Sequence, residues 1–181
     1  MPEKSAKYVV SPRWTRNMNG VEEGLSDLHD AYLSARLMYQ CMDKVPIEKV
    51  NLPLRSLLQD RRRFERLWVA FLAVTVEAWE AAKTRPVMEW IRSVTGTAEL
   101  DDLLREAGEN GHLAKIKKCR HYMFHRGWRK HSDDGRWAPE GEFEFNRRLY
   151  MAFSGVLREA IDAVNATKKR SRCSKTRQSC L

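Results

Sequence analysis

The sequence predicts an all-α fold, a bundle of four to five helices with a short loop or hairpin inserted before the last helix. Long stretches place apolar residues three and four positions apart, which is the spacing of one face of an α-helix. No stretch has a convincing strand pattern. With 181 residues, 43% of them hydrophobic, the chain is long enough for one domain with a real core.

The net charge of +9 is concentrated at the two ends of the chain. Residues 1–20 carry four basic side chains and one acidic one with little periodicity, and are expected to form an irregular arm. Residues 21–167 are expected to form the helical domain, and residues 168–181 a basic tail. That tail either holds a polyanion loosely through phosphate contacts or merely keeps the protein soluble.

The sequence indicates a cytoplasmic protein that does not enter a membrane. No apolar run approaches the length of a membrane span, and the first residues lack the apolar stretch of a signal peptide. The four cysteines are scattered without a Cys-x-x-Cys pair, so reduced thiols are expected. They are Cys41, Cys119, Cys173 and Cys180.

The first two helices are long. The first is expected from Val21 to about Met42, where apolar residues recur in steps of four and three before Pro46 ends the helix. The second is expected over residues 54–83. Its middle, residues 64–76, is apolar nearly all round, which predicts a central helix covered by its neighbours on most sides.

Shorter helices are expected to follow. Pro86 permits a new helix start, and Thr97 is a plausible N-cap for a further short helix that Gly108 and Gly111 stop. The most basic helix of the body is then expected over residues 112–126. We call it the motif helix because it contains the candidate site.

The remaining segment is expected to be a loop and a closing helix. Residues 127–142 are expected to form a loop or a small hairpin, in which Asp134 and Gly135 mark the turn. Apolar residues then recur on one side of a helix expected over residues 145–167. That helix closes the bundle.

The candidate site is the segment of residues 119–127, Cys-Arg-His-Tyr-Met-Phe-His-Arg-Gly. Arg120 is permanently cationic and reaches phosphate oxygens with a planar fork, while His125 can accept or donate a proton near neutral pH. Together they suit phosphodiester chemistry. On an ideal helix the two positions point roughly 140° apart. They converge only if the helix frays at Gly127, if Arg120 curls around, or if a second copy supplies the missing half.

This segment resembles the HEPN superfamily of all-helical domains. Its ribonuclease members carry Arg, then a polar residue, three further residues and His, which here reads Arg120, His121 and His125. The resemblance implies a bundle that usually dimerises, with the arginine and histidine of both protomers lining a cleft at the interface. It also implies cleavage of RNA without a metal, so we expect no cofactor and no metal ion.

In the implied mechanism, His125 is the general base on the ribose 2′-hydroxyl or the general acid to the leaving 5′-oxygen, and the partner's His125 takes the other role. Arg120 stabilises the charge that develops on the phosphorane oxygens. His121 holds the arginine or the histidine by hydrogen bonding. The products would be a 2′,3′-cyclic phosphate and a 5′-hydroxyl. The resemblance suggests a toxin, a defence system or RNA processing, with an antitoxin or a regulatory protein as a further partner.

Other residues are expected to support this site. Glu77 would orient Arg120 or His125, or else is an ordinary acid near a helix end. Tyr122 is a supporting residue of the motif helix. RNA would be bound by basic and aromatic residues in and after this helix, since these contact phosphates and stack on unpaired bases. They are Lys117, Lys118, Arg126, Trp128 and Arg129.

Three alternatives remain open from the sequence. The domain could be a non-catalytic HEPN-like module that binds RNA or protein. His121 and His125 share a helix face and lie close to Cys119, so they could hold a metal if His112 or His131 supplied a third ligand. In a purely structural role, His125 would cap its own helix and Arg120 would pair with Glu77 or with another acid of the long helix, Glu80.

Overall fold

The computed structural model describes residues 18–44, 54–125 and 142–178, and every element in those ranges is an α-helix. The predicted all-α class is therefore confirmed. Six helices follow one another in the described part of the chain, including two short ones. They are α2 (Met18–Lys44), α3 (Leu54–Ala82), α4 (Pro86–Val94), α5 (Ala98–Glu109), α6 (His112–His125) and α7 (Glu142–Gln178).

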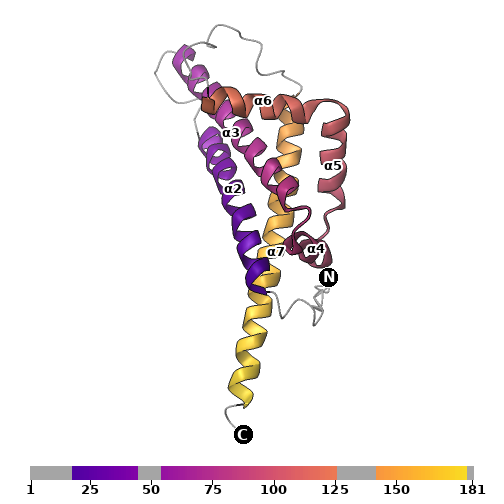
Figure 1. The fold of residues 1–181 in the computed structure, drawn as a ribbon. Coiled ribbons are helices and arrows are strands. Elements are labelled where there is room, and N and C mark those ends of the chain that lie inside the picture. The colour runs from indigo at the N-terminus through magenta and orange to yellow at the C-terminus, as the bar shows by residue number, and fades with distance from the viewer. Residues whose placement is uncertain (1–17, 45–53, 126–141, 179–181) are drawn as a thin grey trace, which may run out of the picture.

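The three long helices form the body of the molecule (Figure 1). Helix α2 packs against α3 and α7, and α4 lies against α2 and α7 near one end of the bundle. Helix α6 crosses the opposite end, where it packs on α3, and α5 connects the two ends on one side. The motif helix is thus an outer element that lies across the bundle.

The last helix differs most from its predicted bounds. It begins at Glu142 and ends at Gln178, whereas the sequence predicts residues 145–167 followed by a basic tail. Residues 168–178 contain no proline or glycine, and lysine and arginine are good helix formers, so nothing in the chain stops the helix at Thr167. Its final turns extend beyond the other helices (Figure 1). Of the predicted loop 127–142, residue Glu142 is the first residue of α7, and residues 127–141 lie outside the described residues.

The core follows the predicted apolar stripes. The apolar stripe of the predicted first helix is buried except at Tyr39, which is partly buried. Its positions are Val21, Leu25, Leu28, Tyr32, Ala35, Tyr39 and Met42. Tyr39 stacks on Tyr150 of α7, and Trp68 of α3 packs against both rings. The largest buried side chains are three tryptophans whose indole N–H groups have no hydrogen-bond partner among the described residues. They are Trp68, Trp79 and Trp90.

Two glycines set the packing of the shorter helices. A Cβ atom on Gly24 of α2 would lie 2.9 Å from Val87 Cγ1, so glycine lets α4 approach α2 closely. Gly111, between α5 and α6, has a φ of +72°, a conformation that glycine adopts without the steric cost of a side chain. Gly111, which is predicted to end the preceding helix, therefore forms a turn after which α6 runs across the bundle.

The predicted starts of the short helices hold as well, whereas α5 continues past Gly108 and ends at Glu109. Pro86 occupies the first turn of α4, and Thr97 is the residue before α5. The Thr97 hydroxyl, however, does not cap the backbone of α5. It donates to Asp101 Oδ2 at 2.9 Å, one turn into the helix.

Candidate functional site

The start of the motif helix α6 is fastened to the start of α7 by a buried histidine. His112 Nε2 lies 2.9 Å from Asn146 Oδ1, and both side chains are buried. The His112 ring packs edge-on against Phe145. Lys115 Nζ, one turn further along α6, lies 2.6 Å from Glu142 Oε1. These contacts fix the orientation of α6 at the end opposite to the Arg/His motif.

Two ion pairs join α6 to α3, and we call them the α3-facing pairs. Arg120 Nη1 lies 2.5 Å from Glu77 Oε2, and Lys117 Nζ lies 2.8 Å from Glu80 Oε2. Both helices contribute residues three apart, so the pairs stack side by side where the helices cross. All four side chains are about one third exposed (32–37%), so water screens each pair and its contribution to stability is about 0–1 kcal/mol.

Glu77 therefore meets Arg120, which is one of the contacts that the sequence leaves open. The carboxylate fixes one end of the guanidinium, while the planar group has further N–H donors and remains in contact with solvent. The same contact suits a positioned catalytic arginine and a plain tie between helices. Glu80 pairs with Lys117, so Arg120 and Lys117 each have their own acid on α3.

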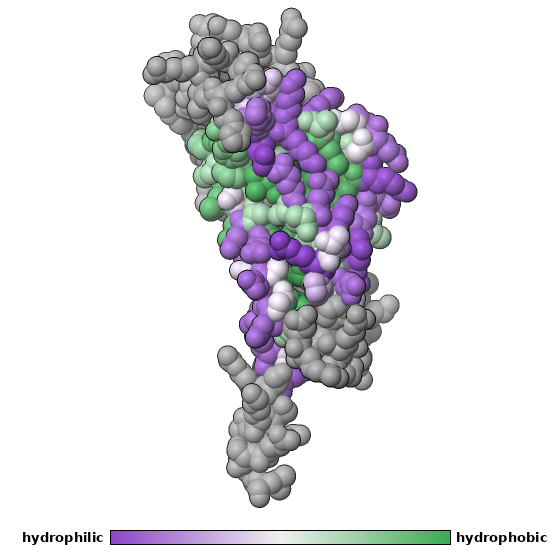
Figure 2. All heavy atoms as spheres, viewed as in Figure 1, coloured by the Kyte–Doolittle hydropathy of each residue, from purple (hydrophilic) through white to green (hydrophobic). Residues whose placement is uncertain are grey.

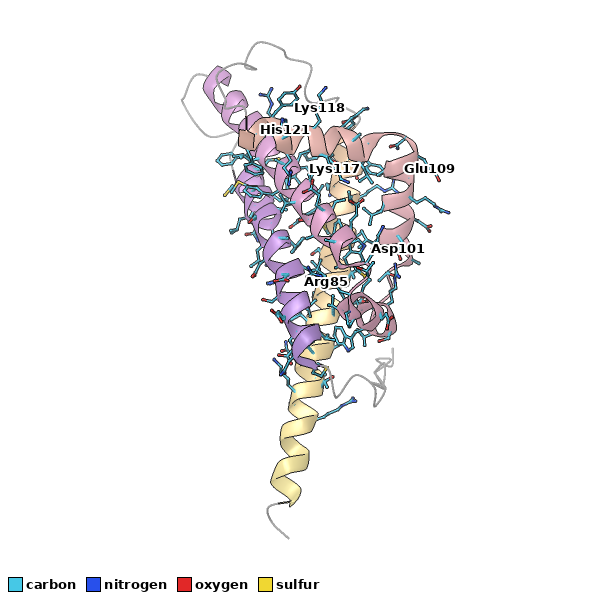
Figure 3. The ribbon with its side chains drawn as sticks, in the orientation of Figure 1. Arg85, Asp101, Glu109, Lys117, Lys118 and His121 are labelled. Atoms are coloured by element: carbon cyan, nitrogen blue, oxygen red, sulfur yellow. The ribbon has the colours of Figure 1, made fainter. Side chains whose placement is uncertain are left out.

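The other side of α6 presents a different set of side chains, which we call the outward face: Lys118, His121 and Tyr122. Lys118 and His121 are exposed and Tyr122 is half-buried. Lys118 Nζ lies 5.7 Å from the centre of the Tyr122 ring, and the His121 and Tyr122 ring centres are 6.1 Å apart. Figure 3 shows Lys118 on the outer side of α6 and Lys117 on the side toward the bundle.

Position 125 belongs to the same side of the helix. It lies seven residues after Lys118 and four after His121, spacings that return to one face of an α-helix. His125 is the last residue of α6, but its side chain lies outside the described part of the structure, as do Arg126, Trp128 and Arg129. The structure does not test the contacts predicted for these four residues.

Cys119 lies beneath the motif and faces α3. It is 3% exposed, and its thiol donates a hydrogen bond to the Arg66 carbonyl oxygen at 3.6 Å. Burial raises the pKa of Cys119 to about 12, against an opposing effect of the Arg66 charge. Since the thiolate is the form that attacks electrophiles and binds metals, Cys119 is a structural residue near neutral pH.

The described residues contain no group of three or more His, Cys, Asp or Glu side chains that could hold a metal ion. Of the ligands considered from the sequence, Cys119 is buried against α3 whereas His121 is exposed on the outward face. These two side chains therefore do not converge on one ion.

Sequence reasoning missed the role of His112, which it considered only as the start of the motif helix and as a possible third metal ligand. Asn110 Oδ1 accepts a hydrogen bond from the His112 backbone N–H at 3.0 Å, so the Asn-Gly-His run is a helix start with a local cap. The Asn-Gly-His run can be recognised in the sequence as a helix start. The partner of His112, Asn146, lies 34 residues away on another helix and cannot be recognised in this way.

A comparison with protein-family models, with curated proteins and with solved structures finds no match to this chain. In the described part of the chain, none of the helices combines the length and the apolar character needed to cross a membrane. Hydrophilic residues instead cover much of the visible surface around α5 and α6 (Figure 2). The residues of the motif helix are therefore the main indication of function.

Proposed function

We propose that this protein is a metal-independent endoribonuclease of the HEPN type that acts as a homodimer. The observation that supports this proposal best is the Arg120–Glu77 pair, which holds a solvent-accessible guanidinium on the helix that ends at His125. A fixed guanidinium suits phosphodiester cleavage, because preorganised donors stabilise the charge that develops in the transition state.

In this proposal each residue of the motif has one role. His125 exchanges a proton with the ribose 2′-hydroxyl or with the leaving 5′-oxygen. Arg120 donates hydrogen bonds to the phosphorane oxygens, and Glu77 keeps its guanidinium in position. His121, the exposed residue that follows Arg120, holds the arginine or the catalytic histidine by a hydrogen bond. Cleavage yields a 2′,3′-cyclic phosphate and a 5′-hydroxyl.

The helix geometry favours a dimer. Positions 120 and 125 are roughly 140° apart around α6, so one helix does not aim both side chains at one phosphate. Helix α6 runs through His125, and Gly127, at which the helix could fray, lies outside the described residues. A second copy of α6 would bring the arginine of one protomer to the histidine of the other.

The test is RNA cleavage by the full-length protein in EDTA, with analysis of the product ends. Arg120→Ala is expected to reduce cleavage by about 100- to 1000-fold, the usual effect of removing one transition-state donor. His125→Ala should abolish detectable cleavage, and wild-type products should carry the cyclic phosphate. A metal requirement, or full activity of both variants, would contradict the proposal.

The second candidate is a non-catalytic HEPN-like module that binds RNA or protein. The same ion pair favours it, because an arginine bound to a carboxylate of a neighbouring helix also serves simply to join the helices. A folded, dimeric wild type that cleaves no RNA would favour this candidate.

A further inference from the structure

We infer that the outward face of α6 binds an unpaired RNA strand, with Tyr122 stacking on a base and Lys118 contacting a backbone phosphate. The inference rests on the proposed function in one respect, the identity of the polymer as RNA. Its own support comes from the charge, exposure and spacing of the described side chains on this face.

The two adjacent lysines of α6, Lys117 and Lys118, have different electrostatic surroundings. Lys117 lies 2.8 Å from the Glu80 carboxylate, so its charge is already matched within the protein. Lys118 is exposed about 100° further around the helix, and among the described residues it forms no ion pair. Its nearby contact is the face of the Tyr122 ring, at 5.7 Å from the ring centre. Lys118 thus keeps its charge available for an external anion.

The aromatic residue beside this cation points to an unpaired strand. Tyr122 is half-buried, which holds the ring in place yet leaves part of it in contact with solvent. A tyrosine ring stacks on any base that is free of its own neighbours, and an adjacent cation binds the phosphate that follows. An RNA duplex keeps its bases stacked inside and offers mainly phosphates and 2′-hydroxyls. Tyr122 would therefore add little to duplex binding.

The spacing places this face next to the proposed chemistry. Lys118, Tyr122 and position 125 are separated by four and three residues, so they form one row along α6 that is roughly 10 Å long. A strand that contacts Lys118 and stacks on Tyr122 is led along the helix toward position 125. The outward face would in this way position the phosphodiester that is cut.

The inference is tested by the affinity of the full-length protein for an RNA oligonucleotide whose 2′-hydroxyls are methylated. Such RNA cannot be cut by attack of its own 2′-oxygen, so binding is measured whether or not the protein is a nuclease. Tyr122→Leu should weaken binding of the unpaired strand about 5- to 150-fold, the range found for loss of one base stack. Tyr122→Phe keeps the ring and should bind like wild type.

Salt dependence tests the lysine separately. Lys118→Gln should lower the slope of log affinity against log salt by about 0.7, the value for one phosphate contact on a single strand. Lys117→Gln is the matched comparison. The sequence places Lys117 with Lys118 among the RNA-binding residues, but its charge is paired with Glu80, so its substitution should lower the slope less than Lys118→Gln does. Circular dichroism would establish that both variants fold.

Two results would overturn the inference: wild-type affinity of Tyr122→Leu for the unpaired strand, or equal affinity of the protein for the strand and for its duplex. Failure of the nuclease proposal would look different. In that case unmodified RNA would stay intact, while binding of the methylated strand would still depend on Tyr122 and Lys118.

Discussion

Both sides of α6 carry basic side chains, but only those on one side are paired with acidic residues of a neighbouring helix. On the α3-facing side, Lys117 and Arg120 each meet a glutamate of α3, and Cys119 lies buried between the helices. On the outward face, Lys118 and His121 are exposed beside the half-buried Tyr122. The number of basic residues in a helix therefore does not show how many of them can bind an external anion. What matters is which charges the neighbouring helix already matches.

Arg120 belongs to the α3-facing side. Its ion pair with Glu77 resembles the neighbouring Lys117–Glu80 pair in distance and exposure. The proposed function requires the two pairs to differ in effect, because only one of them positions a group that contacts the reacting phosphate. A pair of matched substitutions separates these possibilities.

The largest effect in this comparison is expected from Glu77→Gln. The variant removes the charge that fixes Arg120, and we expect cleavage to fall about 10- to 100-fold, since a misplacement of about 1 Å costs that much. The free energy of unfolding should change by less than about 1 kcal/mol, because the pair is partly exposed. Product formation and urea unfolding are measured on the same samples.

Glu80→Gln is the control for this prediction. It breaks the equivalent pair with Lys117, at a similar distance and exposure, and should leave cleavage unchanged. If both variants lost the same activity, Glu77 would be no more than a structural tie. If neither did, Arg120 would need no positioning by α3.

A smaller effect, on stability, is expected at the other end of α6. Asn146→Ala removes the hydrogen-bond partner of His112 Nε2 and leaves a buried polar nitrogen unpaired. We expect the free energy of unfolding to fall by about 1–3 kcal/mol. RNA binding by the remaining folded protein should be unchanged, because the outward face is not touched. The measurement is urea unfolding followed by circular dichroism.

The double variant His112→Phe with Asn146→Leu sharpens this test. It replaces both polar partners by apolar side chains, which is far less costly than leaving one of them unpaired. Recovery of much of the lost stability would identify the hydrogen bond as the cause. An unaltered stability of Asn146→Ala would show that α6 does not depend on this contact.

Much of the fold was predictable from the sequence because it follows from local rules. The apolar spacing from Val21 to Met42 indicates which side of α2 is buried, and Gly111 marks the turn before the motif helix. The end of α7 was not predicted, since residues 168–178 were interpreted through their charge although they contain no helix-breaking residue. Charge and helical propensity are independent properties of a segment.

The site was predictable only in part, for a physical reason. Spacing along one helix shows that positions 118, 121, 122 and 125 share a face. It does not show which acid of another helix a given cation meets, because that depends on the crossing of α6 over α3. The Arg120–Glu77 contact therefore remained one of several alternatives, and the His112–Asn146 contact was missed altogether.

The smallest expected effect tests whether the α3-facing side stays closed to water. Burial raises the pKa of Cys119 from its ordinary 9.0 to about 12. Between these pH values the folded protein keeps a proton that the unfolded chain loses, so wild-type stability falls as the pH rises, by about 1 kcal/mol per pH unit. Cys119→Ala should lack this contribution, whereas Cys41→Ala, at an exposed position, should keep it. Equal pH dependence of both variants in urea unfolding at pH 9 and 10 would mean that water reaches the thiol, and the contrast between the two sides of α6 would then be weaker than the structure indicates.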